Sequence, residues 1–220
     1  MINFKGAIFD LDGTLLDSMG VWEKIDIDFL AKRNLSVPEN YTSEISALSF
    51  RKTAEYTIDR FHLKETAEDL MKEWNHMAAY EYSHMITLKP YAKEYLATLK
   101  ACGIRIGTAT SLSGVLAKSA LINHGIYNLF DIQCETDEVG KGKDSPDVFL
   151  LAAEKLGVVP EECIVFEDLL AGICSAKKAG MKKVFGIYDE YSKEQAEEIQ
   201  KAADGYYYSF KDAPVPQNVW

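Results

Sequence analysis

The sequence predicts an α/β protein: a doubly wound parallel sheet that carries an inserted α-helical segment. After Pro90, short apolar segments alternate with segments of helical period, an order typical of parallel βαβ units. Between residues 18 and 84 the period is helical throughout, and this block directly follows the first apolar segment. The block is therefore predicted to be an insertion into the sheet domain, not a linker.

The first predicted elements are a strand and a group of amphipathic helices. Residues 5–10 read KGAIFD and are predicted to form a short buried strand, followed by a turn at Asp12-Gly13-Thr14. Within residues 18–84, apolar side chains recur at helical spacing and predict three to four helices. The spacing is seen in Trp22, Ile25 and Phe29, in Ala54, Ile58 and Phe61, and in Leu70, Trp74 and Met77.

The rest of the chain is predicted to alternate between helices and strands. Strands are expected at 104–109, near 130–132, at 163–166, at 183–187 and at 205–208. Helices are expected at 91–101, 113–123, 146–156 and 170–179, and from 192 to about 203. Ser145 is expected to cap the 146–156 helix, with Pro146 at its first position, and Ser192 with Gln195 to form a capping box. The tail from Ala213 is predicted to be loose.

Composition excludes several classes of function. The 220 residues are 47% hydrophobic and carry a net charge of −10, which makes nucleic acid or an anionic membrane an unfavourable partner. No apolar run reaches the ~18–20 residues of a membrane span, and the first residues lack the features of a signal peptide. The four cysteines are far apart and suit reduced thiols. We expect a cytoplasmic monomer.

Polar side chains follow the predicted strands at the points where they end. Asp10 and Asp12 follow the first strand, Thr110-Ser111 the second, and Glu167-Asp168 the strand at 163–166, while Lys143 lies in the loop after 130–132. The carboxyl ends of parallel strands meet at one edge, where ligands bind. Each piece alone has a structural explanation as a turn, a cap or a surface lysine. Clustered carboxylates repel one another, and Mg²⁺ is the hard cation that best relieves this conflict.

These residues carry a resemblance to a known family. Residues 10–18, DLDGTLLDS, resemble the first motif of the haloacid dehalogenase-like (HAD) hydrolase superfamily, and Thr110-Ser111 the second. GKDSPDVF at 142–149 resembles the third motif, and 166–168 the fourth. The resemblance implies a HAD-like Rossmannoid core domain at 1–15 and 87–220. It also implies an α-helical cap domain at 16–86, as in the phosphatase and β-phosphoglucomutase-like branch.

The resemblance also implies a role for each motif residue. Asp10 is expected to be the nucleophile that forms an aspartyl-phosphate, and Asp12 the general acid and base. Mg²⁺ is expected to be bound by the side chains of Asp10 and Asp168 and by the backbone carbonyl of Asp12. Glu167 is expected to orient a metal-bound water. Phosphate is expected to bind Lys143, Thr110 and the backbone N–H of Ser111 at a helix start. One departure is Asp144, which stands where the family usually has proline.

The expected activity is a phosphatase acting on a small phosphorylated metabolite. A general acid two residues after the nucleophile favours phosphoryl transfer over dehalogenation, because a halide needs no proton to leave. In the cap, Trp22 and Arg51 are candidate substrate contacts. A β-phosphoglucomutase-like sugar-phosphate mutase is an alternative, although Trp22 and Ala78 replace the histidine and lysine of mutases. A non-catalytic binding protein with a HAD fold is the other alternative.

Overall fold

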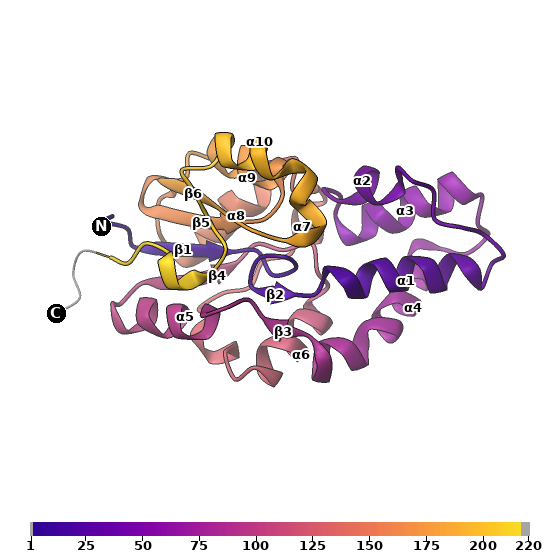
Figure 1. The fold of residues 1–220 in the computed structure, drawn as a ribbon, viewed down its shortest axis with the longest axis horizontal. Coiled ribbons are helices and arrows are strands. Elements are labelled where there is room, and N and C mark those ends of the chain that lie inside the picture. Colours follow the sequence, from indigo (N-terminus) through magenta and orange to yellow (C-terminus); the bar gives the residue numbers. More distant parts are fainter. Residues whose placement is uncertain (1, 217–220) are drawn as a thin grey trace.

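The structure, a computed structural model, describes residues 2–216 and has a parallel sheet at its centre (Figure 1). Five strands lie in the order β4-β1-β5-β6-β7, and every pairing between them is parallel. Their bounds are β1 Gly6–Phe9, β4 Arg105–Thr108, β5 Cys163–Glu167, β6 Lys183–Ile187 and β7 Gly205–Tyr207. The predicted doubly wound α/β fold is confirmed, including the short final strand at one edge.

Helices cover both faces of the sheet because alternate strand residues point to opposite sides. In β1, Ala7 and Phe9 join the hydrophobic cluster on the side of α5, while Ile8 joins the cluster on the side of α8, α9 and α10. The helices of the sheet unit are α5 Ala92–Ala101, α6 Gly114–Asn123, α7 Thr136–Val139, α8 Asp147–Leu156, α9 Leu170–Lys178 and α10 Ala196–Ala202.

The helical block forms a separate lobe beyond the ends of the strands, at the right of Figure 1. Its elements are α1 Met19–Ala31, α2 Tyr41–Ile45, α3 Phe50–Phe61 and α4 Ala67–Tyr80, followed by a π-helical turn, Glu81–Met85. The chain enters this block through β2, Leu16–Asp17, and leaves it through β3, Thr87–Leu88. These two short strands pair antiparallel. We call residues 19–85 the helical insertion; its helical character confirms the prediction.

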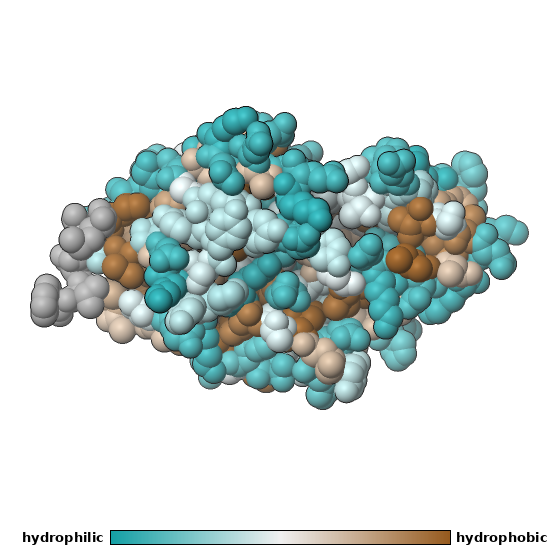
Figure 2. All heavy atoms as spheres, viewed as in Figure 1, coloured by the Kyte–Doolittle hydropathy of each residue, from teal (hydrophilic) through white to brown (hydrophobic). Residues whose placement is uncertain are grey.

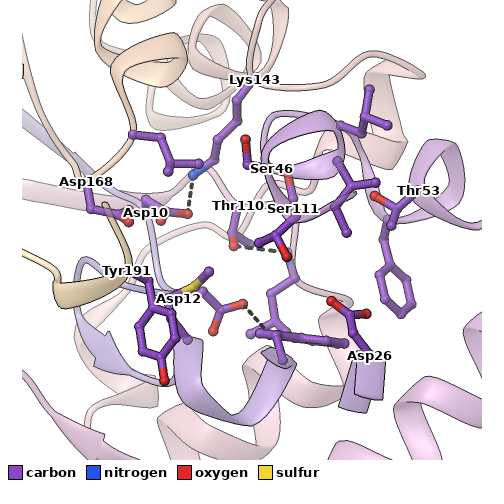
Figure 3. A pocket seen from close by; sticks show the side chains of 18 of the residues that line it. Asp10, Asp12, Asp26, Ser46, Thr53, Thr110, Ser111, Lys143, Asp168 and Tyr191 are labelled. Atoms are coloured by element: carbon purple, nitrogen blue, oxygen red, sulfur yellow. Dashed lines mark hydrogen bonds and ion pairs between the residues drawn. The ribbon is translucent and has the colours of Figure 1, made fainter. Parts of the chain in front are cut away.

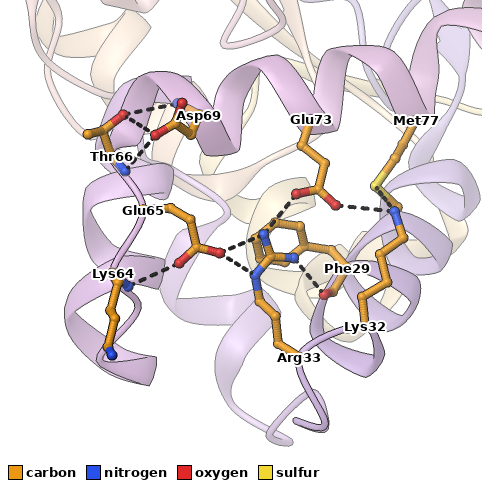
Figure 4. A network of polar contacts seen from close by, with 9 residues as sticks. All are labelled: Phe29, Lys32, Arg33, Lys64, Glu65, Thr66, Asp69, Glu73 and Met77. Atoms are coloured by element: carbon orange, nitrogen blue, oxygen red, sulfur yellow. Dashed lines mark hydrogen bonds and ion pairs between the residues drawn. The ribbon is translucent and has the colours of Figure 1, made fainter.

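Arg33, just after α1, ties the helices of the insertion together (Figure 4). Its guanidinium donates to Glu65 at 3.0 Å and to Glu73 of α4 at 2.8 Å. It also lies 3.8 Å above the ring of Phe29 and donates to that residue's carbonyl. Because the Arg33 side chain is only 18% exposed, these bonds are better shielded from water than those of a surface ion pair.

Three local predictions are wrong, and side-chain hydrogen bonds explain two of them. Residues 130–132 form no strand; Ile132 makes a single bridge to Gly107, and the Asp131 carboxylate takes the backbone N–H of Ile106 at 2.8 Å. Ser192 is buried and donates to the carbonyl of Asp189, so residues 190–195 form a 3₁₀ segment before α10. Ser145 is not a cap, since Pro146 holds the N-cap position of α8.

Among residues 2–216, the longest helices are too short or too polar to cross a bilayer.

Candidate active site

Three carboxylates converge where β1 and β5 end. Phe9 and Phe166 are partners in the β1–β5 register, and their rings stack at 5.0 Å, so the residues that follow them leave the sheet at one level. Oxygen atoms of Asp10, Glu167 and Asp168 lie within 4.8 Å of one another, and all three side chains are buried. The predicted convergence of strand ends is therefore present.

Lys143 is the cation of this cluster and is itself buried. Its ammonium forms ion pairs with Asp10 and, at 2.8 Å, with Glu167. Burial alone would lower the pKa of Lys143, but the negative charges of Asp10 and Glu167 outweigh it and hold that pKa above its usual range. Asp144 is exposed and takes no part in these ion pairs. The departure from the family pattern leaves Lys143 in place.

The cluster carries more negative charge than one lysine neutralises. Burial raises the pKa of Glu167 to about 7, against the lowering effect of Lys143. Burial, together with the charges of Glu167 and Asp10, raises the pKa of Asp168 well above its usual value. The atoms available to bind a metal ion are all carboxylate or carbonyl oxygens, the ligands that hard divalent cations prefer. The donor set therefore fits Mg²⁺.

Gly13 allows the turn after β1 to pass close to Asp168. Its φ is +77°, a left-handed value, and a Cβ at this position would lie 2.3 Å from a carboxylate oxygen of Asp168. On the other side, the Thr14 hydroxyl donates to Asp168 at 3.0 Å. The turn predicted from Asp12-Gly13-Thr14 thus fixes the orientation of the Asp168 carboxylate.

The Asp12 carboxylate accepts three hydrogen bonds, all from residues that follow the turn. Ser18 donates to it at 2.6 Å, Tyr82 at 2.5 Å, and the Trp22 indole at 3.2 Å. Burial raises the pKa of Asp12 to about 6; Ser18 and Tyr82 lower it, and the charge of Asp10 raises it further. Tyr82 was missed by the sequence analysis. It lies in the π-helical turn, a type of irregularity that is frequent at functional sites.

Thr110 and Ser111 line the same pocket as Asp10 and Lys143 (Figure 3). Thr110 is 2% exposed, and its hydroxyl accepts the backbone N–H of Leu112 at 3.1 Å. The expectation that Ser111 stands at a helix start is wrong, because α6 begins at Gly114 with Ser113 as its N-cap. The Thr136 hydroxyl donates to Ser111 instead, at 3.3 Å.

The helical insertion closes the pocket on the side away from the sheet. Trp22, Phe50 and Trp74 contribute apolar walls, and Asp26, Ser46 and Thr53 contribute polar groups that the sequence analysis missed. Trp22, a predicted substrate contact, lines the pocket. Arg51 does not; it is exposed and pairs with Glu68 at 2.6 Å. The structure gives the prediction for Arg51 no support.

The insertion also contacts the Lys143 loop directly. The backbone N–H of Lys143 donates to the carbonyl of Ala47 at 2.7 Å. A Cβ on Gly142 would lie 2.1 Å from that carbonyl oxygen and 2.9 Å from the Cα of Leu48. Only glycine fits at residue 142 while the insertion lies against this loop.

Comparisons with known proteins by sequence and by structure indicate the same family and the same fold. The model of the haloacid dehalogenase-like hydrolases matches residues 7–185. Hexitol phosphatase A of Escherichia coli is 33% identical over 180 residues, 80% of each chain, and the phosphorylated carbohydrates phosphatase of Thermotoga maritima is 27% identical over 83% of this chain and 85% of its own. The crystal structure of CbbY from Rhodobacter sphaeroides with phosphate superposes with a TM-score of 0.82 at 25% identity, covering 95% of this chain and 96% of that one.

Proposed function

The chain belongs to the haloacid dehalogenase-like hydrolases, and from this membership we propose that it is a Mg²⁺-dependent phosphatase of phosphorylated carbohydrates that works through an aspartyl-phosphate. The observation that carries the proposal is the buried group of Asp10, Glu167 and Asp168 around one lysine, with Asp12 two residues beyond Asp10. The relatives named as carbohydrate phosphatases support the substrate class.

In the first proposed step, a carboxylate oxygen of Asp10 attacks the phosphorus and forms an acyl-phosphate. The bond from phosphorus to the ester oxygen breaks, and Asp12 gives its proton to that oxygen, so that an alcohol leaves. Lys143 and Thr110 hold the phosphoryl oxygens and offset the repulsion between two anions. In the second step, water attacks the phosphorus and gives its proton to Asp12, releasing phosphate and regenerating Asp10.

We propose that Asp10, Asp168 and the carbonyl of Asp12 hold Mg²⁺, with Glu167 orienting a metal-bound water. When bound, the ion supplies positive charge against the phosphoryl group and the clustered carboxylates. Glu167 also accepts the backbone N–H of Leu169 at 3.1 Å, which fixes its orientation.

We also propose that residues 16–86 act as a cap that closes over a core made of residues 1–15 and 87–220. The paired strands β2 and β3 are the two points at which the chain crosses between these parts. Ser18, Trp22 and Tyr82 all reach Asp12 from the cap side. Closure would therefore fix the orientation of Asp12, the proposed acid and base, in the same movement that excludes water.

The mutase alternative is less well supported. A mutase binds two phosphates, yet Lys143 is the one cationic side chain among the described residues that line the pocket. Ala78, aligned with the second-phosphate lysine of mutases, is buried in the hydrophobic core. A β-phosphoglucomutase from Clostridium difficile superposes with a TM-score of 0.81 at 21% identity. This similarity supports the fold alone.

The proposed function is tested by release of phosphate from sugar phosphates and polyol phosphates with and without Mg²⁺. We expect turnover with Mg²⁺, its loss after EDTA treatment, and its return when Mg²⁺ is restored. A bisphosphate activator should not change the rate. Isomerised sugar phosphate that depends on the activator would establish the mutase instead, and no phosphate release from any ester would favour a non-catalytic binding protein.

Substituting Gly142 with alanine should impair closure. The added Cβ would overlap the carbonyl of Ala47, so loop 46–48 must withdraw from Lys143. We expect kcat/KM to fall by about 10- to 100-fold, because small misplacements at a site are costly. Gly140→Ala is the matched control: φ is +65° there, so the backbone is strained, but a Cβ meets nothing within 4 Å. It should lower the melting temperature and spare turnover; equal loss of turnover in both variants would contradict the closure argument.

A further inference from the structure

Asp26 is a carboxylate in the pocket that the proposed chemistry does not use. It lies on α1 one turn after Trp22, and residues four apart share a helix face. Figure 3 places Asp26 and Thr53 across the pocket from Asp10 and Lys143. A phosphate held by Lys143 would therefore direct the rest of its substrate toward Asp26.

The Asp26 carboxylate has no donor among the described residues. Burial is the sole cause that raises its pKa, to about 7, with neither a hydrogen bond nor a nearby cation to offset it. By its exposed surface Asp26 is half-buried, and a partly desolvated carboxylate without a partner destabilises the fold. This cost is offset if a bound ligand donates a hydrogen bond to Asp26.

A second unsatisfied group lines the same pocket. The indole N–H of Trp74 is buried and has no acceptor in the described part of the chain, and the residue is 2% exposed. The residues that line the pocket thus include an acceptor without a donor and, with its N–H beneath the pocket surface, a donor without an acceptor. A hydroxyl group can donate to Asp26 and also has lone pairs for an N–H, whereas an ammonium group has none.

The charges of the pocket exclude a second anion on the substrate. Asp10, Asp12, Glu23, Asp26 and Asp168 line it. Lys143 is the one cation among the described lining residues and already pairs with Asp10 and Glu167. A carboxylate or second phosphate near Asp26 would meet like charge with no cation to balance it.

We propose that Asp26 determines specificity: it accepts a hydroxyl of an uncharged polyol or sugar leaving group and excludes substrates with a second anionic group. The proposal rests on the proposed phosphatase function and narrows it. Trp22, Phe50 and Trp74 would cover the C–H faces of the same leaving group. Ser46 and Thr53 add further hydroxyls to that part of the pocket.

The test compares four esters: sorbitol 6-phosphate, phenyl phosphate, 2-phosphoglycolate and phosphoethanolamine. For the unmodified protein we expect kcat/KM for sorbitol 6-phosphate to exceed that for 2-phosphoglycolate by about 100-fold. In Asp26→Asn, the ratio of sorbitol 6-phosphate to phenyl phosphate should fall by about 10- to 100-fold. Asp28→Asn removes an exposed carboxylate from the same helix and should leave that ratio unchanged.

The proposal is overturned if the ratio is the same in Asp26→Asn, if Asp28→Asn lowers it equally, or if phosphoethanolamine is the preferred ester. Binding gives a readout that does not need turnover. In an Asp10→Asn background, adding Asp26→Asn should weaken calorimetric binding of sorbitol 6-phosphate by at least about 10-fold. If Asp26→Asn weakens this binding but the unmodified protein releases no phosphate, the proposed function alone is refuted. Unchanged binding would refute the role of Asp26.

Discussion

Asp10→Asn should reduce phosphate release by on the order of 10⁴-fold or more, because the amide cannot supply the attacking oxygen. The fold should survive. Asparagine has nearly the same shape, and Lys143 keeps Glu167 as a partner at 2.8 Å. The measurement is single-turnover phosphate release at saturating Mg²⁺ with sorbitol 6-phosphate, together with chemical trapping of the acyl-phosphate in the unmodified protein.

The matched control is Asp144→Asn, which removes an exposed carboxylate next to Lys143 in the chain. It changes the net charge by the same amount but touches neither the carboxylate cluster nor the Lys143 ion pairs. We expect full activity in this variant. Substantial turnover in Asp10→Asn, or a trapped phosphoryl group on another residue, would show that Asp10 is not the nucleophile.

The carboxylates and Thr110 of the site were predictable because each of them stands at or next to a strand end. Asp10, Thr110 and Asp168 follow β1, β4 and β5 within one or two residues. Parallel strands bring such positions to one edge whatever the details of packing. The strand pattern was therefore enough to place the carboxylates together.

The side of the site that the helical insertion forms was not predictable in the same way. Which residue of a helix faces a pocket depends on how that helix packs, and a shift of one residue turns the side chain by about 100°. Phe50 lines the pocket while Arg51, the next residue, points to solvent and pairs with Glu68. Tyr82 reaches Asp12 from a π-helical turn that has no signature in the sequence.

Local side-chain hydrogen bonds explain two of the three failures in secondary structure. The segment around 130–132 is apolar enough for a strand. However, the Asp131 carboxylate accepts a hydrogen bond from the backbone N–H of Ile106 in β4, and in a regular strand pair a backbone carbonyl would accept it. The predicted pairing remains as two isolated bridges, Gly107 with Ile132 and Thr110 with Glu135, and as backbone hydrogen bonds such as that from the Cys134 N–H to the Thr108 carbonyl at 3.2 Å. The segment still runs beside β4 and delivers the chain to the Lys143 loop, so the error did not disturb the site.

In the proposed mechanism, the three hydrogen bonds to Asp12 connect the position of the proposed cap, residues 16–86, to proton transfer. Two of the donors, Trp22 and Tyr82, lie in the helical insertion, and their polar atoms are 2.7 Å apart. If the cap opened, Asp12 would exchange both for water. A carboxyl group that is fixed only in the closed state would protonate a leaving group only after the substrate has been enclosed.

Asp12→Asn should separate the two proposed steps. For sorbitol 6-phosphate, whose alkoxide is a strong base, we expect kcat to fall by roughly 10²- to 10⁴-fold because no acid protonates the leaving oxygen. With p-nitrophenyl phosphate the leaving group needs no proton, so the first turnover should persist as a rapid burst of p-nitrophenol. Steady-state release should then be slow, since the base that activates water is also missing. Stopped-flow absorbance resolves the burst from the slow phase. If both phases slow together for both esters, the substitution has disrupted the site as a whole, and Asp12 is not the acid and base.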